Sequence, residues 1–225
     1  MFFDLDRTLW DFESNATETL KELFVKYELY KLTDNSQSFI DIYAIINRRL
    51  WAEYSSGNIT KEKLRHMRFY LALKHFGVDD HEIGKAMDVD YIETCPQKTL
   101  LFPYTKEILE YLSKKKYKLY ILTNGFPEVQ ARKLENTGIG NYFDAVITSE
   151  DAGYQKPNVR IFQYALSIAK VPVKKCIMIG DDWDADICGA KNAGINQIFF
   201  NPYKKIHKGK PTYEISSLDE IKKIL

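Results

Sequence analysis

Two patterns of apolar and polar residues divide the chain near residue 96. From about Phe12 to Glu93, apolar side chains recur at helical spacing and no run is typical of a strand. Thr60 is the expected N-cap of the third helix in this segment, and Gly77 is the expected glycine just after its end. The predicted helices span Ser14–Tyr30, Ser36–Ser55, Lys61–Phe76 and Asp80–Glu93.

Beyond Pro96, short apolar runs alternate with helical stretches. The runs predict strands over Lys118–Thr123, Ala145–Thr148, Lys175–Gly180 and Gln197–Asn201. Helices are predicted over Pro127–Thr137, Asn158–Ala169, Asp184–Ala193 and Leu218–Leu225, with Pro157 opening the second and Ser217 capping the last. Strands that alternate with helices are typical of βαβ units in a parallel sheet. The expected fold class is therefore α/β.

A further apolar run, Met1–Phe3, opens the chain directly before Asp4 and Asp6. It is the candidate first strand of the same sheet. Either this strand is short, or the natural chain has residues upstream of Met1. We expect an α/β core of residues 1–12 and 96–225, with a helical domain of residues 13–95 inserted directly after the first strand.

Charge and composition narrow the class of protein. The chain has 32 Lys and Arg against 31 Asp and Glu, and 45% of its residues are hydrophobic. Because proteins that bind nucleic-acid polymers carry a marked basic excess, we exclude such a partner. No apolar stretch has the length of a membrane span, and Cys95, Cys176 and Cys188 show no disulfide or metal-ligand spacing. We expect a cytoplasmic globular protein, a monomer or homodimer, with no membrane contact.

Two carboxylates stand at the end of the first apolar run. Asp4 and Asp6 alternate with Leu5, so in an extended chain both side chains point to one face. Like charges this close repel, and either a divalent cation or a proton on one acid relieves the repulsion. Ligands of open α/β sheets bind at the carboxyl ends of the strands. The pair is therefore a candidate site.

Three later strands are also followed by polar residues. Thr123, Asn124 and Gly125 come after the first of them, and Lys156 precedes Pro157 in a loop after the second. Taken alone, these residues also fit a capped turn and a solvated lysine. The run that follows Gly180, from Asp181 to Asp186, holds four acids in six residues, and such a set needs a cation or hydrogen bonds. Oxygen ligands beside a substrate phosphate suit Mg²⁺.

Other metal and nucleotide motifs are absent from the sequence. An EF-hand loop needs glycine at its sixth position and glutamate at its twelfth, and counting from Asp4 or Asp182 gives neither. The four histidines form no HExxH pair, and there is no GxxxxGK[ST] loop. Calcium, zinc and P-loop chemistry are therefore not indicated.

These parts, in this order, resemble the haloacid dehalogenase superfamily, most of whose members are Mg²⁺-dependent phosphohydrolases. Asp4-Leu5-Asp6-Arg7-Thr8 is similar to its DxDxT motif, although many members have glycine where Arg7 stands. Thr123 matches the second motif, Lys156 the third, and Gly180-Asp181 with Asp186 the fourth. Gly189–Gly194 is similar to the GAxxAG that follows, and DLDRTLWDFE is similar to the branch of house-cleaning pyrimidine 5′-nucleotidases.

The resemblance implies a Rossmann-like core with a C1-type helical cap, which closes over the leaving group. It implies Asp4 as nucleophile, through an aspartyl-phosphate, and Asp6 as general acid and base. Mg²⁺ would be held by Asp4, the backbone carbonyl of Asp6, and Asp181, with Asp182 and Asp186 orienting its waters. Phosphate oxygens would be bound by Thr123, Asn124 and Lys156. The implied substrate is a small phosphate monoester, such as a nucleoside 5′-monophosphate.

Other activities share this fold. A hydrolytic dehalogenase needs no metal and no acid at position 6, so Asp6 argues against it. A sugar-phosphate phosphatase and a phosphomutase share all four motifs and stay open as alternatives. A non-catalytic binding module is the alternative from another class, although such a protein would usually have lost one of the four acid and lysine residues, Asp4, Asp6, Lys156 and Asp181.

Overall fold

The computed structural model describes residues 1–225, and the chain divides into two compact units. One consists of Met1–Phe12 and Thr99–Leu225, and we call it the α/β unit. The other consists of Glu13–Lys98, and we call it the helical unit. Each is described by itself.

The α/β unit is built on a six-stranded sheet in the order β3-β2-β1-β4-β5-β6, and every neighbouring pair is parallel. The strands are β1 (Phe2–Phe3), β2 (Tyr120–Thr123), β3 (Ala145–Thr148), β4 (Ile177–Gly180), β5 (Asn196–Phe200) and β6 (Tyr213–Ile215). The predicted α/β fold class is confirmed. The sequence prediction missed β6, whose Tyr213 and Glu214 are exposed, because an edge strand this short presents no continuous apolar run.

The two-residue strand β1 lies at the centre of the sheet. Phe2 pairs with Tyr120 of β2 on one side and with Met178 of β4 on the other. Both phenylalanines of β1 are fully buried. The backbone N–H of Asp4 donates to the carbonyl of Ile179 at 2.9 Å, which extends the pairing by one step. The chain therefore delivers Asp4 to the carboxyl edge of the sheet, between the ends of β2 and β4.

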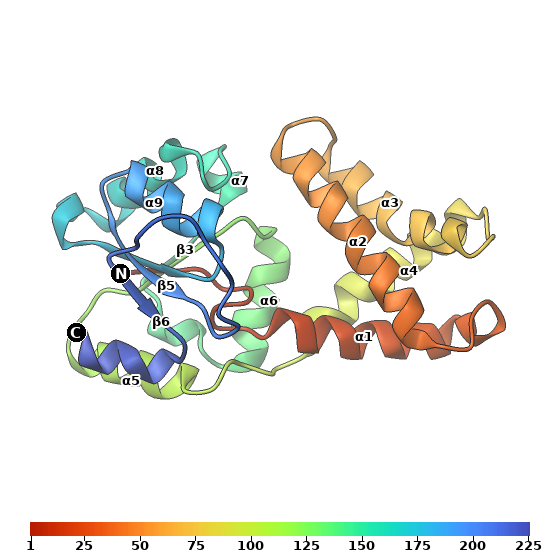
Figure 1. The fold of residues 1–225 in the computed structure, drawn as a ribbon, viewed down its shortest axis with the longest axis horizontal. Helices are drawn as coiled ribbons and strands as arrows, with labels where there is room; N and C mark the ends of the chain where they lie inside the picture. Colours follow the sequence, from red (N-terminus) through yellow and green to blue (C-terminus); the bar gives the residue numbers. More distant parts are fainter. The chain divides into compact units, whose positions relative to one another are not determined.

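Helices cover both faces of this sheet (Figure 1). One face carries α7 (Ser149–Ala152), α8 (Val159–Ala169) and α9 (Gly189–Asn192), and its core includes Phe2, Leu122 and Met178 packed against Phe162 of α8. The other face carries α5 (Thr105–Lys114), α6 (Pro127–Thr137) and the 3₁₀ helix η6 (Leu218–Lys223). Alternation along the strands turns successive apolar side chains to opposite faces, so one sheet supports both layers.

Several helices differ from the sequence prediction. It omitted α5, although the buried Ile108, Leu109 and Leu112 have helical spacing. The stretch predicted as one helix from Asp184 to Ala193 is a π-helix, η5 (Trp183–Cys188), followed by α9. Pro157 was predicted to open α8 but lies outside it, because Asn158 is the N-cap and Val159 the first helical residue. The final helix is the 3₁₀ helix η6. Ser217 caps its N-terminus as predicted, and forms a capping box with Glu220.

The helical unit holds the four helices predicted for this part of the chain. They are α1 (Phe12–Lys26), whose first residue belongs to the α/β unit, α2 (Ser36–Ser55), α3 (Lys61–His75) and α4 (His81–Thr94). Thr60 caps α3 by accepting from the N–H of Lys63, and Gly77 has a φ of 86°, as predicted for a residue beyond its end. Aromatic rings form much of the core, with Tyr43 and Phe69 centred 4.7 Å apart.

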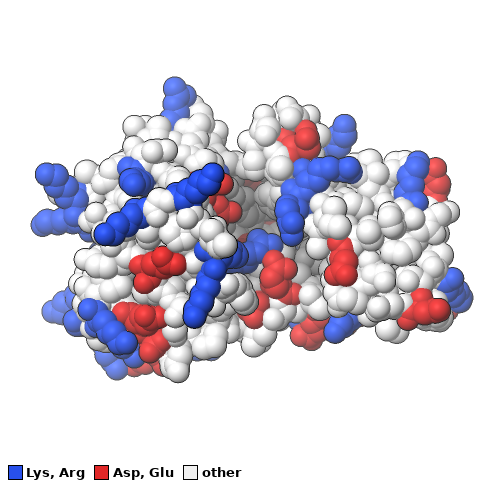
Figure 2. All heavy atoms as spheres, viewed as in Figure 1, with Lys and Arg blue, Asp and Glu red and all other residues white.

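Short 3₁₀ segments complete the chain: η1 (Leu29–Lys31), η2 (Cys95–Gln97), η3 (Gly140–Tyr142) and η4 (Val173–Lys175). None of the helices combines the length and apolarity that crossing a membrane would require. The three cysteines are free. On the face shown in Figure 2, basic and acidic side chains are interspersed over the surface, as expected for a net charge of +1.

Candidate active site

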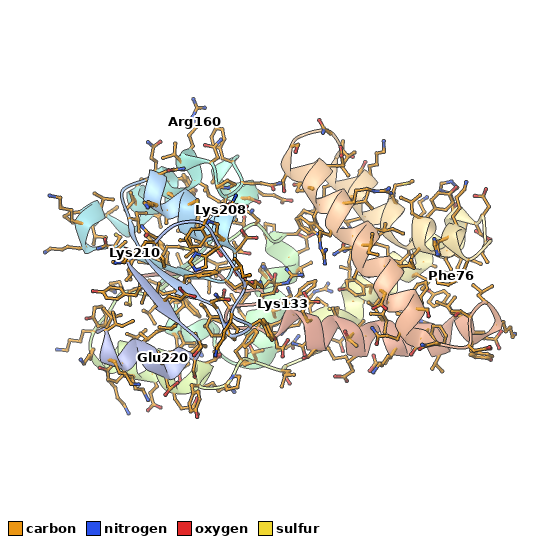
Figure 3. The ribbon with its side chains drawn as sticks, in the orientation of Figure 1. Phe76, Lys133, Arg160, Lys208, Lys210 and Glu220 are labelled. Carbon is orange, nitrogen blue, oxygen red and sulfur yellow. The ribbon has the colours of Figure 1, made fainter.

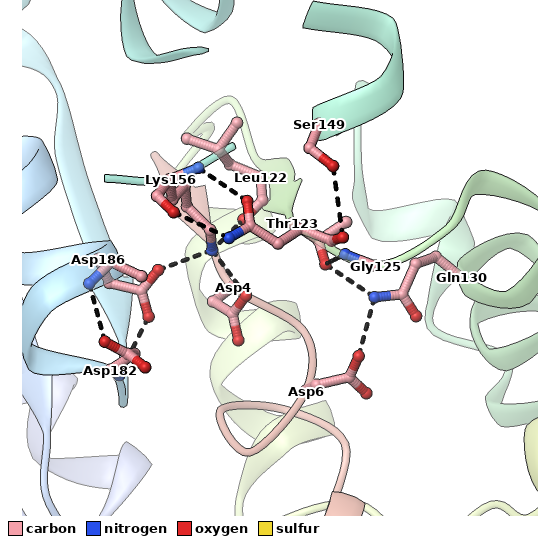
Figure 4. A network of polar contacts seen from close by, with 12 residues as sticks. Asp4, Asp6, Leu122, Thr123, Gly125, Gln130, Ser149, Lys156, Asp182 and Asp186 are labelled. Carbon is pink, nitrogen blue, oxygen red and sulfur yellow. Dashed lines mark hydrogen bonds and ion pairs between the residues drawn. The ribbon is translucent and has the colours of Figure 1, made fainter. Parts of the chain in front are cut away.

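The predicted site residues gather at the carboxyl edge of the sheet. Asp4 follows β1, Thr123 ends β2, and Asp181 follows β4. Lys156 comes from the loop between α7 and α8, and reaches the same edge (Figure 4). Asp4, Thr123, Lys156 and Asp181 are all buried, with exposed fractions of 8% or less. Positions far apart in the sequence thus converge because parallel strands end at one edge.

Lys156 is the hub of the polar network in Figure 4. Its Nζ donates to Asp4 Oδ1 at 2.8 Å, to Asp186 Oδ1 at 2.6 Å and to the carbonyl of Leu122 at 2.7 Å. Burial lowers the pKa of Lys156, but the carboxylates of Asp186 and Asp4 outweigh burial, so the pKa stands above its usual value. Lys156 is therefore a fixed positive charge at the end of the central strands.

Gly180 allows Asp186 to fold back onto the site. Asp186 Oδ1 accepts from Lys156 Nζ, and its Oδ2 accepts from the N–H of Asp182 at 3.1 Å. A Cβ on Gly180 would lie 2.2 Å from that Oδ2, closer than real atoms approach. The glycine of the Gly180-Asp181 pair is thus explained by the space that Asp186 occupies.

Replacing Gly180 with alanine is expected to push Asp186 away from Lys156. We expect turnover to fall on the order of 10²-fold, because displacing a positioning group by about 1 Å has that effect, and overpacking to reduce stability by about 1–3 kcal/mol. Gly140→Ala is the matched control, because a Cβ there meets Leu134 at an ordinary 3.6 Å. Steady-state kinetics and thermal unfolding of both variants test this, and equal behaviour of the two would contradict it.

Three buried carboxylates form a candidate metal centre. Oxygens of Asp4, Asp181 and Asp186 all lie within 4.8 Å of one another. Burial raises the pKa of Asp4 and of Asp186, in each case against the opposing charge of Lys156. Burial and the charge of Asp4 raise the pKa of Asp181 to about 6. The buried Lys156 and the exposed Lys205 thus do not balance these three acids, and a divalent cation bound to oxygen ligands would. The donor set therefore fits Mg²⁺.

The three acids differ in their hydrogen bonds within the protein. Asp186 accepts one on each oxygen, Asp4 accepts at Oδ1 from Lys156, and Asp181 accepts at Oδ2 from Lys205 at 3.2 Å. Asp182 is the N-cap of η5, because its Oδ1 accepts from the N–H groups of Asp184 and Ala185. Asp182 thereby fixes the start of the helix that carries Asp186.

Thr123 offers a buried hydroxyl at the end of β2. Its Oγ1 accepts from the N–H of Gly125 at 3.0 Å and from Gln130 Nε2 at 2.7 Å. Both bonds use its lone pairs, so its proton remains to donate to an anion.

Asn124, predicted to bind phosphate, forms two hydrogen bonds with the backbone of Lys156. Its Oδ1 accepts from the N–H of Lys156 at 2.8 Å, and its Nδ2 donates to the carbonyl of Lys156 at 3.0 Å. These two bonds hold the backbone that carries Lys156 against the end of β2. A direct contact of Asn124 with phosphate stays a prediction.

Asp6 faces a different set of partners from Asp4. The chain turns after it, with Arg7 at a φ of 67° and Asp6 in a backbone bridge to Trp10. Lys133 Nζ donates to Asp6 Oδ1 at 2.5 Å, and Gln130 Nε2 donates to Asp6 Oδ2 at 2.9 Å. The extended stretch expected from the alternation of Asp4 and Asp6 thus ends in a turn. Asp6 remains close enough for its charge to raise the pKa of Asp4.

Gln130 and Lys133 were missed by reasoning from the sequence. Both lie on α6, three residues apart, and both are buried together with Leu134 and Thr137. A signal existed, because a helix with so few apolar residues must turn some polar side chains inward to pack at all. Which partners those side chains meet depends on the turn after Asp6, which the sequence pattern did not predict.

Comparison with known proteins shows which family the chain resembles. The family model for haloacid dehalogenase-like hydrolases matches residues 1–194. The pyrimidine 5′-nucleotidase YjjG of Escherichia coli is 33% identical, over 100% of this chain and 96% of its own. The pyrimidine 5′-nucleotidase PynA of Streptococcus pneumoniae is 31% identical, over 98% and 92%. The crystal structure of the HAD-hydrolase YfnB of Bacillus subtilis, bound to magnesium, has a TM-score of 0.89 and 29% identity, over 99% and 96%.

A parallel sheet with acids and a lysine at its carboxyl edge is typical of an α/β protein that binds a ligand at this edge, and the matches identify the family. The chain belongs to the haloacid dehalogenase-like hydrolases. The predicted resemblance and the prediction of a hydrolytic enzyme are confirmed.

Proposed function

We propose that this enzyme is a Mg²⁺-dependent phosphatase that transfers a phosphoryl group to Asp4, with nucleoside 5′-monophosphates as substrates. The observation that carries the proposal is the buried bond of Asp4 to Lys156 beside Asp181, at one end of the sheet. The substrate class is supported by the full-length similarity to two proteins named pyrimidine 5′-nucleotidases.

Asp4 is the nucleophile in this proposal. Lys156 holds its Oδ1, which leaves Oδ2 to attack phosphorus. A bond forms between Oδ2 and phosphorus as the bond between phosphorus and the ester oxygen breaks, which gives an aspartyl-phosphate. Water then attacks that phosphorus, restores the Asp4 carboxylate and releases inorganic phosphate.

Lys156 and Thr123 stabilise the transferred phosphoryl group, the lysine through its charge and the threonine through a hydrogen bond. The charge of the transition state lies on the three equatorial oxygens of phosphorus, and fixed donors stabilise it without reorganisation. The Lys156 ammonium supplies a buried positive charge, and the Thr123 hydroxyl supplies a proton that no protein group accepts. Asn124 holds the backbone of Lys156.

Asp6 is the general acid and base. A protonated Asp6 gives its proton to the leaving oxygen in the first step, and the resulting carboxylate takes a proton from the attacking water in the second. Such a cycle suits a carboxyl group that is partly exposed, and the side chain of Asp6 is 21% exposed against 10% for Asp4.

Asp4, Asp181 and the backbone carbonyl of Asp6 are the groups that would hold Mg²⁺. When bound, the cation neutralises phosphate charge that would otherwise repel Asp4. Asp186 keeps Lys156 in place, and Asp182 fixes the helix that carries Asp186. We also propose that these two acids orient the waters of the cation.

Phosphate release from a panel of nucleoside monophosphates and sugar phosphates, with Mg²⁺ or with EDTA, tests the proposal. We expect metal-dependent turnover in which pyrimidine nucleotides have the highest kcat/KM. Turnover led by sugar phosphates would keep the mechanism and replace the substrate class. The absence of release from every substrate, with 4-nitrophenyl phosphate included, would overturn the phosphatase and favour a phosphomutase or a binding module.

A further inference from the structure

Helix α6 directs two buried polar side chains at Asp6. Gln130 and Lys133 lie three residues apart, so they share one face of the helix. Gln130 is fully buried and Lys133 is 4% exposed. Lys133 is thus buried, whereas Arg160 projects from the surface of the same unit (Figure 3). A buried lysine needs a partner, and its partner here is Asp6.

Both oxygens of Asp6 are fixed by this face. Lys133 donates to Oδ1 and Gln130 donates to Oδ2, and the two hydrogen bonds together set the plane of the carboxyl group. Each carboxylate oxygen has two lone pairs, so one on each oxygen remains for a proton in transit. Lys133 is itself held in place, because its Nζ lies 4.2 Å from the centre of the Trp10 ring, and Trp10 is bridged to Asp6 through the backbone.

Gln130 also joins Asp6 to Thr123. The same Nε2 donates to Asp6 Oδ2 and to Thr123 Oγ1, at 2.9 and 2.7 Å (Figure 4). A Cβ on Gly125 would lie 2.2 Å from this Nε2, so glycine at position 125 leaves the space that Gln130 fills. The amide thus fixes the spacing between the proton donor and the hydroxyl that faces phosphate.

We infer that Lys133 and Gln130 are positioning residues that aim Asp6 at the leaving oxygen of the ester. The inference rests on the proposed function. As the bond between phosphorus and the ester oxygen breaks, the proton of Asp6 passes to that oxygen, and Asp6 becomes the carboxylate that Lys133 and Gln130 hold. Later the carboxylate takes a proton from the water that attacks the aspartyl-phosphate, and Asp6 returns to its starting form.

The dependence of rate on leaving group separates this role from a structural one. Because phosphorylation of Asp4 is the first irreversible step, kcat/KM reports only the steps up to ester cleavage. A nucleoside leaves as an alkoxide that needs a proton, whereas 4-nitrophenolate leaves without one. If the carboxyl group of Asp6 is no longer held in position, kcat/KM should therefore fall for the nucleotide and stay nearly unchanged for the aryl ester.

The experiment compares Lys133→Met and Gln130→Met with wild type on the best nucleotide of the panel and on 4-nitrophenyl phosphate. We expect kcat/KM for the nucleotide to fall on the order of 10–100-fold, part of what general acid catalysis supplies, and kcat/KM for the aryl ester to change by less than about 3-fold. Lys133→Arg keeps the charge and should restore most of the rate. Lys118→Met is the matched control, because it removes an exposed lysine paired with Asp144 in the same unit.

Equal losses on both substrates in Lys133→Met and Gln130→Met, or wild-type rates on both, would overturn the inference. If Lys133→Met does not fold, the other two variants test the inference. Gln130→Met keeps the hydrogen bond from Lys133, and Lys133→Arg keeps the positive charge. A wild-type protein that hydrolyses neither ester would instead refute the proposed function, a result that the variants cannot produce.

Discussion

Replacing Asp4 with asparagine is expected to abolish phosphate release from every substrate that the wild-type protein hydrolyses. The carboxamide has nearly the shape of the carboxylate but supplies no anionic oxygen to attack phosphorus. Removing a covalent nucleophile lowers kcat on the order of 10⁴-fold or more. The loss should be the same for nucleotides and aryl esters, because both must form the same aspartyl-phosphate.

Trapping of the covalent intermediate identifies the atom that reacts. Wild-type protein quenched in acid during turnover of ³²P-labelled substrate should retain label, and Asp4→Asn should retain none. Asp184→Asn is the matched control, because it makes the same change at an exposed acid of the Gly180–Asp186 run. Label that persists in Asp4→Asn would place the nucleophile elsewhere, and normal turnover by that variant would remove Asp4 from the mechanism.

The sequence predicted the parts of the site that follow from strand order. Asp4, Thr123 and Asp181 each end or follow an apolar run, and the ends of parallel strands meet at one edge whatever the lengths of the loops between them. For this reason their convergence could be predicted although β1 has two residues and the predicted strand bounds were too long for β2 and β4. Lys156 lies in a loop after α7, and only the motif order predicted that it joins them. Motif order carried more information than any boundary.

What the sequence did not predict depends on contacts between elements. The inward face of α6 is polar, so its sequence cannot be told from that of an exposed face. The turn after Asp6 places a carboxylate against this face, and that contact is tertiary. The cap formed by Asp182 depends on the π-helix that replaces an ordinary first turn. In both cases tertiary contacts decide what a polar side chain does, and local propensity does not.

Burying the acid cluster lowers the free energy of unfolding of the metal-free protein. The raised pKa of Asp181 gives the magnitude for one of these acids. The pKa of Asp181 is raised from 3.8 to about 6 by burial and by the charge of Asp4. The folded state therefore binds this proton more tightly than the unfolded state does, and the free energy of unfolding falls as pH rises from about 4 to about 6. Two pKa units correspond to about 3 kcal/mol at most.

Asp181→Asn is therefore expected to stabilise the metal-free protein and to inactivate the enzyme. Asparagine is neutral at every pH, so in EDTA at pH 7.5 the variant should be more stable than wild type by up to about 3 kcal/mol, which is roughly 6–12 °C in Tm for a chain of this size. At pH 4 the difference should nearly vanish, because Asp181 is then protonated in wild type. Thermal unfolding at both pH values measures this.

Added Mg²⁺ should reverse the order of stability. Wild type should gain Tm with MgCl₂ at pH 7.5 because a cation bound to the folded state stabilises it by mass action, and the gain should shrink below pH 6 as Asp181 takes up a proton. Asp181→Asn should gain little and should lose turnover on the order of 10³-fold, since the cation contributes several kcal/mol to the transition state. Asp184→Asn should follow wild type in both buffers.

Two results would contradict this account of Asp181. If Asp181→Asn is less stable than wild type in EDTA at pH 7.5, the ion pair with Lys205 outweighs the cost of burying Asp181. If Asp181→Asn keeps metal-dependent turnover, Asp181 is not part of the metal centre. A residue that destabilises the empty protein yet is needed by the loaded one is what a buried cation site requires, since the same crowded negative charge does both.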